Sequence, residues 1–453
     1  MELKEENLDI SINQWKERLE KDLKGITFQQ LSKTDSNGIE IFPFYNKENS
    51  IKQHQISFTH REWEICSQQI SEEDHIQNKS ALKHLNNGAN SLIFNIHSGT
   101  NPKKLLDSIQ AEYITTHFAY KEKNIEFIDG LNSYFKGINS NFSQINGSII
   151  YDPISTYLRG YKEGFELRLN FWKKISESEL INNSALSSFT TDAYIYQNSG
   201  CNTVNELAFT LAQVNEQLHF ISQHNIKTSD KKFVIFTSTG INFFENLCKF
   251  KSLRNLIKFL LNEYGLKNEI FIHATNSLIN KTAKDVYNNL IRSTIEAMSA
   301  IAGGANSISI APYNFVTEKK DANAQRLAMN QLLILKEEAF LSKVAEVGAG
   351  SFYTDEYCNN LSEKAWEKFK FIESEGGLIS FFDKGKLQSD INEDASKLKE
   401  EFVSGKKILT GVNKFLNLKE NPNQRIFPGY RNENGINFES IEEWINESVT
   451  NSQ

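Results

Sequence analysis

The chain has 453 residues, of which 39% are hydrophobic and 24% are charged, a composition typical of globular proteins. No uncharged apolar run approaches the roughly 18 residues that a membrane span needs, so we expect no membrane-spanning segment. Fifty basic residues against 57 acidic ones give a net charge of -7, opposite to the basic surface that binds a phosphate backbone. The composition therefore predicts that neither a membrane nor a nucleic acid is a partner.

The four cysteines lie far apart in the sequence and form no C-x-x-C pair, which argues against a zinc knuckle or a redox dithiol. They are Cys66, Cys201, Cys248 and Cys358. The acidic, helix-forming start of the chain lacks the basic and apolar regions of a secretory signal. We therefore expect reduced thiols in a cytoplasmic protein.

The histidines and serines form no recognisable metal-binding or nucleophile motif. No H-E-x-x-H occurs, and His54 with His60, or His219 with His224, are not spaced to place two ligands on one helical face. A G-x-S-x-G elbow is also missing. We expect no metal site and no nucleophilic catalysis.

Eight candidate strands alternate with helical segments along most of the chain. Several are near-continuous apolar runs, as in parallel strands covered on both faces, and eight β/α units close naturally into a barrel. No G-x-G-x-x-G follows the first strand, which argues against the competing open, doubly wound sheet. We predict an α/β fold, an eight-stranded TIM-type β/α barrel, with strands at Ser91–His97, Ile114–Phe118, Ile125–Asp129, Ser148–Tyr151, Phe189–Tyr196, Phe233–Thr239, Ile270–Ala274 and Ser307–Tyr313.

Additional segments flank the predicted barrel. Apolar residues recur at helical spacing over residues 11–24, and residues 38–60 look extended, so we expect an N-terminal wrapping arm. We assign residues 1–85 to the arm, 86–380 to the barrel, and 381–453 to a short helical and loop C-terminal extension. Helices are predicted at Ala324–Val347, Leu361–Glu375 and Ile441–Val449.

In such a barrel, the side chains that follow the strands line the mouth where chemistry takes place. Asp129 and Asp152 are candidate mouth carboxylates, or else turn and helix-cap residues beside Gly or Pro. His97 and His273 are candidate acids or bases, but a structural role is favoured because no carboxylate partner can be assigned. The predicted strand ends supply His97, Asp129, Asp152, Tyr194, Tyr196, Gln197, Thr239, His273 and Asn314.

Three ordered segments carry a family resemblance: DAYIYQNSGCNTVNELAFTLAQVNEQL (192–218), KDVYNNLIRSTIEAMSAIAGGANSISIAPYN (284–314) and RLAMNQLLILKEEAFLSKVAEVGAGSFY (326–353). Together they resemble the barrel of adenosylcobalamin-dependent methylmalonyl-CoA mutase. The sequences WKERLEKDLKG at 15–25 and ILTGVNKFLN at 408–417 are similar to the small, or β, subunit of the heterodimeric mutases. The resemblance covers nearly the whole chain and implies that the barrel prediction is right.

This sequence departs from the family where the catalytic chain meets its substrate. The strand that reads G-Y-H in that chain reads Ala193, Tyr194, Ile195 here, so the imidazole expected at the thioester carbonyl is missing. In the arm motif, Cys66 and Gln68 replace the Arg and Tyr expected to meet the acyl-CoA.

A second departure follows the two glycines at 303 and 304. The catalytic pattern G-G-T-Q-S-L-H-T becomes GGANSISI, so Asn306 and Ser309 replace Gln and His. The resemblance thus implies no catalytic residues in this chain, and a degenerate barrel mouth at Tyr194, Ile195, Gln197, Asn306 and Ser309.

The family's catalytic chain also carries a C-terminal cobalamin domain with a D-x-H-x-x-G motif. No histidine follows His273, and about 45 residues beyond Ile408 are too few for such a flavodoxin-like domain. We therefore expect no cobalamin-binding domain and no cofactor held by this chain alone. The resemblance implies that adenosylcobalamin is bound by the partner subunit.

These residues favour a non-catalytic small subunit that stabilises a large catalytic subunit in a heterodimer interconverting methylmalonyl-CoA and succinyl-CoA. We expect subunit docking through Trp15, Leu19 and Leu23 of the arm helix. The alternative is the substrate-binding chain of an acyl-CoA mutase whose cobalamin domain is a separate polypeptide. An unrelated metabolite-binding barrel is a third possibility that the ordered motifs disfavour.

Overall fold

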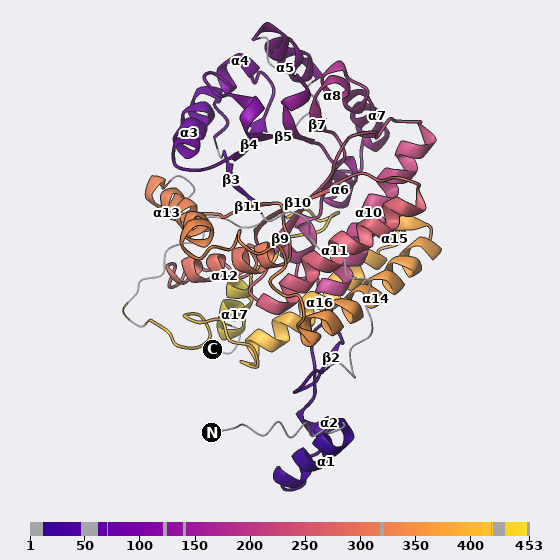
Figure 1. The fold of residues 1–453 in the computed structure, drawn as a ribbon, viewed down its shortest axis with the longest axis vertical. Helices are drawn as coiled ribbons and strands as arrows, with labels where there is room; N and C mark the ends of the chain where they lie inside the picture. Colours follow the sequence, from indigo (N-terminus) through magenta and orange to yellow (C-terminus); the bar gives the residue numbers. More distant parts are fainter. Residues whose placement is uncertain are drawn as a thin grey trace, which may run out of the picture.

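The computed structural model describes residues 12–46, 62–69, 71–120, 125–138, 142–317, 321–417, 419 and 431–450. Its main sheet has nine parallel strands in the order β7-β6-β5-β4-β3-β11-β10-β9-β8, and the sheet curves around a central axis (Figure 1). The strands are β3 (Glu64–Gln68), β4 (Ser91–Ile96), β5 (Thr115–Tyr120), β6 (Asn146–Ile150), β7 (Ala185–Ser187), β8 (Thr190–Asp192), β9 (Phe233–Thr239), β10 (Ile270–Asn276) and β11 (Ser307–Ser309).

β7 and β8 share one position in the barrel wall. β7 pairs with β6 while β8 pairs with β9, and only Ser188 and Phe189 separate the two strands in the sequence. The indole Nε1 of Trp172 donates to the Ser188 carbonyl at 2.8 Å, so this interruption is held by the helix outside it. Counted as one interrupted strand, the pair completes eight parallel positions, and the predicted TIM-type barrel is confirmed.

Three details of the strand prediction are wrong. The predicted strand Phe189–Tyr196 ends at Asp192, and its last residues begin helix α9 (Tyr194–Asn198). Residues 125–129 begin helix α5 (Ile125–Gly137), because Ile128, Leu131 and Phe135 continue the apolar pattern at helical spacing. The eighth position is filled instead by β3, which pairs with β11 and β4. The barrel sheet therefore begins at Glu64, before the boundary expected at residue 86.

The barrel strands alternate between an outer and an inner face. Outward residues such as Phe94, Phe118 and Ile149 are fully buried against the surrounding helices, which explains the apolar runs in the sequence. The helices around the sheet are α3 (Asp74–Asn86), α4 (Pro102–Leu105), α5, α6 (Pro153–Leu158), α7 (Phe165–Ser176), α8 (Glu179–Asn183), α9 (Tyr194–Asn198), α10 (Thr203–Gln223), α11 (Phe243–Glu263), α12 (Asn288–Ala302) and α13 (Ala322–Leu333), which continues as a π-helix at Ile334–Glu338.

Four more helices, α14 to α17, lie outside this ring. α14 (Phe352–Ser374) packs against both α10 and α11, and α15 (Gly377–Asp383) packs against α10 (Figure 1). This second layer explains why α10 is buried on most of its circumference. α16 (Lys386–Val403) and α17 (Ile441–Thr450) pack against each other beyond it.

The N-terminal arm projects away from the barrel in Figure 1. It contains α1 (Ile12–Asp22), α2 (Phe28–Leu31) and a small antiparallel pair, β1 (Lys33–Thr34) with β2 (Glu40–Ile41). Residues 47–61, which include most of the predicted extended segment, lie outside the described residues. The predicted docking residues are half-buried: Trp15 and Leu19 lie on α1, and Leu23 lies in the turn just after it.

Asn37 anchors the base of the arm to the barrel helices. Its side-chain amide donates to Glu245 Oε1 at 2.9 Å and to the Tyr357 hydroxyl at 3.1 Å. Its carbonyl oxygen accepts from the backbone amides of Thr203 and Val204 at the start of α10. The arm base is therefore fixed to α10, α11 and α14.

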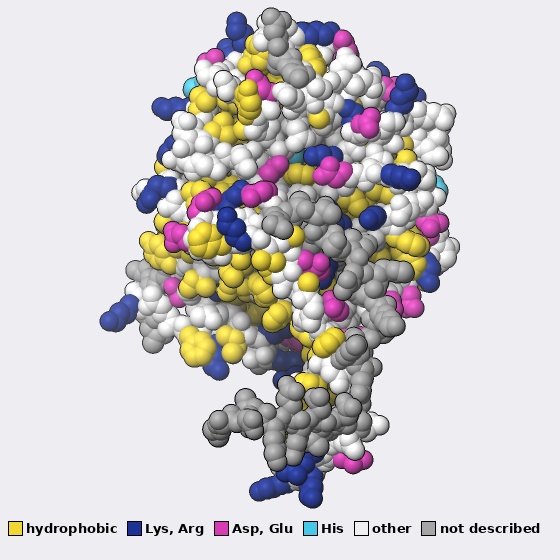
Figure 2. Space-filling view, viewed as in Figure 1, with side chains coloured by type: hydrophobic (Ala, Val, Ile, Leu, Met, Phe, Trp, Pro, Cys, Tyr) yellow, Lys and Arg dark blue, Asp and Glu magenta, His cyan; other side chains and the backbone are white. Residues whose placement is uncertain are grey.

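On the face in Figure 2, acidic and basic side chains are interspersed, and hydrophobic side chains gather over the region of α12. None of the helices in the described part of the chain is both long and apolar enough to cross a membrane.

Candidate functional site at the barrel mouth

A cavity of about 360 Å³ lies at the end of the barrel where the strands finish. Both the inner wall of the sheet and helix α13 contribute to it. The lining side chains from the strands are Cys66, Ser67, Gln68, Ile93, Asn95, Ala119, Ile150, Asp192, Phe236, Thr237, His273, Thr275 and Ser309. This is the end at which TIM barrels place their active sites.

The floor of the cavity includes His273, whose two ring nitrogens both lie beside serine hydroxyls. Nδ1 is 3.1 Å from Ser307 Oγ, and Nε2 is 3.1 Å from Ser309 Oγ. Complete burial lowers the pKa of His273 from 6.5 to about 3, because the charged imidazole would lose its hydration. His273 is therefore a neutral structural histidine at physiological pH, as the sequence favoured, and is not suited to acid or base catalysis.

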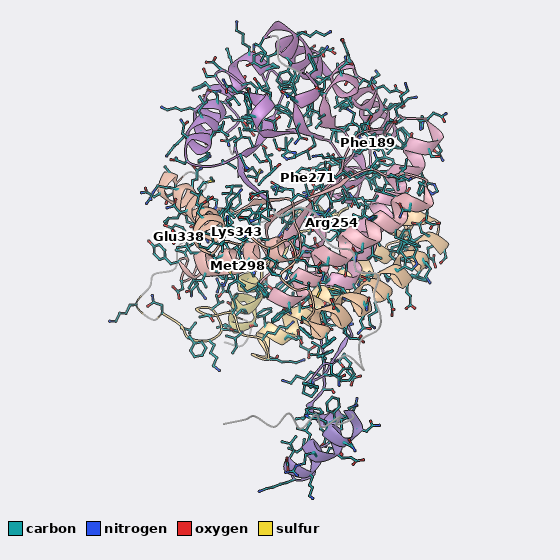
Figure 3. All side chains as sticks on the ribbon, viewed as in Figure 1. Phe189, Arg254, Phe271, Met298, Glu338 and Lys343 are labelled. Atoms are coloured by element: carbon teal, nitrogen blue, oxygen red, sulfur yellow. The ribbon has the colours of Figure 1, made fainter. Side chains whose placement is uncertain are left out.

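Below this floor, three rings fill the barrel axis. The His117 ring centroid lies 5.5 Å from that of Phe236 and 5.9 Å from that of Phe271, which is labelled in Figure 3. His117 is fully buried, and its Nδ1 lies 2.8 Å from Ser148 Oγ. These rings separate the mouth cavity, which Phe236 lines, from a second cavity at the opposite end, which Phe271 lines.

One acidic side chain of the rim is already paired. Asp192 Oδ2 accepts from the Arg159 guanidinium at 2.8 Å. Asp152 does not line the cavity; its Oδ1 accepts from the amides of Ile154 and Ser155, so it caps α6. Burial raises the pKa of Asp152 from 3.8 to about 6.

The chain's own C-terminal segment crosses the mouth. We call residues 431–441 the strap. Its backbone amides at Ile436, Glu439 and Ile441 donate to the carbonyls of Leu158, Asn198 and Ile279 at 2.9, 2.7 and 3.0 Å. Those carbonyls belong to segments that follow β6, β8 and β10, so the strap spans several loops of the mouth.

Phe438 is the strap residue that lines the cavity. Its ring meets that of Tyr194 edge-on, at 5.6 Å between centroids, and the Arg159 guanidinium lies 5.7 Å from its centre. Only 6% of Phe438 is exposed, so its ring is buried and forms part of the cavity wall.

The structure brings together only some of the residues predicted at the mouth. Tyr194 and Ser309 line the cavity. Ile195 is fully buried in the hydrophobic core, and Gln197 Oε1 accepts from Lys249 Nζ at 3.3 Å; neither residue lines the cavity.

Asn306 is a correction, because it lies at the opposite end of the barrel. It immediately precedes β11, and its Oδ1 accepts from Arg254 at 2.6 Å and from the Ile272 amide at 2.9 Å. It lines the second cavity, of about 940 Å³, at the end where the strands begin.

The other predicted strand-end residues also have structural surroundings. Asp129 is a correction, since it is exposed on helix α5 and not at the mouth. His97 lies in a turn with its Nδ1 3.0 Å from Thr100 Oγ1. The remaining contacts are Tyr196 to Gln213, Thr239 to Glu296 and Asn314 to Asp321.

Sequence reasoning missed two contributors to the cavity. Gln325, Ala328, Met329 and Leu332 line it from α13, and their spacing of three to four residues is a signal that could have found them. No local sequence pattern predicts that Phe438 lines the cavity. Among the described residues, no three His, Cys, Asp or Glu side chains converge to form a metal site.

Comparison with known proteins bears on this site. The family model described as methylmalonyl-CoA mutase matches residues 92–433, most of the chain. The chain therefore belongs to the methylmalonyl-CoA mutase family.

Relatives within this family include proteins named as small subunits. The "Methylmalonyl-CoA mutase small subunit" of Porphyromonas gingivalis is 28% identical over 439 residues, covering 91% of this chain and 70% of that protein. The "Methylmalonyl-CoA mutase" of Cereibacter sphaeroides is 30% identical over 242 residues, covering 52% of this chain and 34% of the relative. The "Probable methylmalonyl-CoA mutase small subunit" of Mycobacterium tuberculosis is 28% identical over 244 residues, covering 52% of this chain and 39% of that protein. In the last two comparisons, the aligned half of this mutase-family chain covers only 34% and 39% of the relative's length.

Proposed function

We propose that this chain is the non-catalytic small subunit of an adenosylcobalamin-dependent methylmalonyl-CoA mutase. In this proposal it stabilises a large subunit, which binds the cofactor and interconverts methylmalonyl-CoA and succinyl-CoA. The similarity to a named small subunit over 91% of the chain supports the choice of subunit. The free cysteines support a cytoplasmic location for the complex.

The covered and uncharged barrel mouth is the observation that carries the proposal. Among the described residues that line the cavity, none is a lysine or arginine that could meet the phosphates of an acyl-CoA. The carboxylate of Asp192 is neutralised by Arg159, and His273 is held neutral between two serines. These surroundings supply neither charge complementarity nor a proton donor for a thioester carbonyl.

The mouth also does not fit adenosylcobalamin. A corrin ring is far larger than a 360 Å³ cavity, and the strap already lies across three of the surrounding segments. The two histidines that line the cavity, His84 and His273, are buried beside serine hydroxyls and cannot reach out to a metal. We therefore assign no reaction step to this barrel, which favours a stabilising role over the alternative of a substrate-binding chain.

The arm supports a docking role. Trp15 packs on Phe28 and Phe44 of the same arm, at 6.0 and 4.7 Å between ring centroids, and Phe44 remains 42% exposed. The rings continue through Phe42 and Tyr45 to Tyr353 of α14, so the cluster is joined to the barrel helices while its outer side stays exposed. An exposed aromatic surface of this kind is suited to burial against a second subunit. We propose that this surface contacts the large subunit.

Co-expression with a homologous large subunit tests the proposal. We expect a one-to-one complex on size exclusion, mutase turnover by the complex, and neither turnover nor cobalamin absorbance with the isolated small chain. A Tyr194→Phe variant of the small chain should leave turnover by the complex unchanged, since Tyr194 meets no substrate in this proposal. Turnover by the isolated chain, or a loss of activity of the complex with Tyr194→Phe at unchanged assembly, would favour the substrate-binding alternative.

A further inference from the structure

We propose that the mouth cavity binds a small uncharged amphipathic molecule, an alcohol or amide with a short apolar chain, beneath Phe438. This inference concerns a ligand of the small chain itself and does not depend on pairing with a large subunit. It is distinct from an acyl-CoA site, because the features that favour it are those that disfavour a charged substrate.

Most of the cavity lining is apolar. Ile150 and Phe236 of the sheet face Met329 and Leu332 of α13 across the space, and apolar atoms form most of its surface. A volume of about 360 Å³ lies within the range of small-molecule sites, which is about 300–1,000 Å³. Burying an apolar chain here contributes about 25 cal/mol for each Å² removed from water.

The ionisable side chains that line the cavity are either paired or neutral. Asp192 is paired with Arg159 at 2.8 Å. Ser67 Oγ lies 2.6 Å from His84 Nδ1, and burial lowers the pKa of His84. Burial also lowers the pKa of His273 to about 3 and raises that of the Cys66 thiol to about 12, so both are neutral. An ionised ligand would therefore lose hydration without gaining a counter-charge.

Two glutamine side chains form a polar edge of the cavity. Gln68, at the end of β3, and Gln325, in the first turn of α13, both line the cavity, and α13 packs against β3. Gln68 is exposed and Gln325 is half-buried, and within the described part of the chain no hydrogen bond occupies either side-chain amide. A primary amide donates and accepts, so the pair suits a hydroxyl or amide head group and has no preference for a carboxylate.

Phe438 of the strap forms one wall of the cavity. Phe438 covers the cavity on the Tyr194 side, and its strap is fixed by backbone hydrogen bonds on both sides of the ring, at Ile436 and Glu439. A ligand beneath this ring would be covered on the Tyr194 side, while the edge at the exposed Gln68 stays open to water. The strap therefore acts as a wall of the site.

The test uses the full chain, or the assembled complex, with three probes of equal chain length: 1-hexanol, hexanoate and hexylammonium. Nuclear magnetic resonance titration should show saturable shifts with 1-hexanol and binding about tenfold weaker or more for both ions, because neither ion gains a partner for its charge. Equal or tighter binding of hexanoate would overturn the proposal, as would the absence of saturation with 1-hexanol.

Two variants on one helix locate the site. Ala328→Phe places a ring in the cavity and should weaken 1-hexanol binding about tenfold or more, through loss of the apolar contact area. Ala322→Phe, at the exposed start of α13, should leave binding unchanged. Equal binding by both variants would contradict the assignment.

Two further variants distinguish a loss of binding caused by a filled cavity from one caused by misfolding of the barrel. Met329→Ala enlarges the same space, so it should shift the preferred alcohol from 1-hexanol towards 1-octanol. Phe438→Ala should speed 1-hexanol release about tenfold while assembly with the large subunit is retained. Unchanged chain-length preference and release in these variants would refute the site, whereas failure of assembly would bear only on the proposed function.

Discussion

Lys249 on α11 and Glu206 on α10 form an ion pair of 2.8 Å in which both side chains are almost completely buried. Lys249 Nζ also donates to the Ser238 carbonyl at 2.6 Å, and Thr237 Oγ1 donates to Glu206 at 3.0 Å. The pair therefore joins two helices to β9 inside the core. Burial raises the pKa of Glu206, and contact with Lys249 opposes that shift.

Removing one partner of this pair should be far more damaging than removing both. Lys249→Met leaves the Glu206 carboxylate buried without its counter-charge and should cost about 3–5 kcal/mol of unfolding free energy. The double variant with Glu206→Leu should recover much of this loss, because no unpaired charge remains. Denaturant unfolding of the two single variants and the double variant measures the coupling, and simple additivity of the losses would contradict it.

Gly147 on β6 should tolerate no side chain. Its φ is +134°, and an added Cβ would lie 1.8 Å from the Thr116 carbonyl oxygen on β5. We expect Gly147→Ala to cost about 3 kcal/mol or more, because the paired strands must move apart. Gly137→Ala, at the end of α5 with no atom within 4 Å of the added Cβ, is the matched control and should be neutral or slightly stabilising. Similar thermal unfolding shifts for both variants would show that the strand pair can adjust.

The sequence predicted the strands that have the longest apolar runs. Phe233–Thr239 is buried along its whole length, so its pattern has no competing helical interpretation. Ile125–Asp129 is too short to distinguish a strand from a helical turn, and Glu64–Gln68 contains polar residues that face the barrel interior. Local pattern therefore identified the architecture but misassigned one of its eight positions.

The candidate site could be predicted only where sequence order fixes geometry. Tyr194 lies near the end of the predicted strand Phe189–Tyr196 and two residues after the observed β8, so its place at the mouth follows from the strand assignment. Asn306 was misplaced because a motif match does not say at which end of a short strand a residue lies. Phe438 reaches Tyr194 through chain folding between residues far apart in sequence, and no local pattern records such a contact.

The stability of the protein should fall in mild acid because of His273. The unfolded chain takes up a proton near pH 6.5, but the folded chain resists it down to about pH 3. His273 therefore contributes stability above pH 6.5, and this contribution is lost as the pH falls from 6.5 towards 3, at about 1.4 kcal/mol per pH unit. Burial lowers the pKa of nearby His117 too, which acts in the same direction.

A His273→Gln variant measures this contribution. The difference in unfolding free energy between the native chain and the variant should be constant between pH 7.5 and 8.5 and should decrease by about 1.4 kcal/mol per unit below pH 6. Asp152 acts oppositely, since its raised pKa stabilises the fold below pH 3.8 and this contribution is lost towards pH 6, but it is present in both proteins. A pH-independent difference would contradict the neutral state of His273.

The last prediction concerns the arm, where Trp15 should act as an anchor for the large subunit. Its ring packs on those of Phe28 and Phe44, and Lys16 lies above the Phe28 ring at 4.5 Å. Loss of a half-buried tryptophan from such an interface is expected to cost about 2 kcal/mol or more, a roughly 30-fold weaker complex. Trp15→Ala should therefore raise the dissociation constant of the one-to-one complex, and deletion of residues 1–25 should raise it further.

Asn13→Ala, an exposed position on the same helix, is the control and should leave affinity unchanged. Because Asn37 fixes the arm base separately, the thermal unfolding of the barrel should hardly change in any of these variants. A complex that survives the deletion with the same affinity would show that the large subunit is held by another surface.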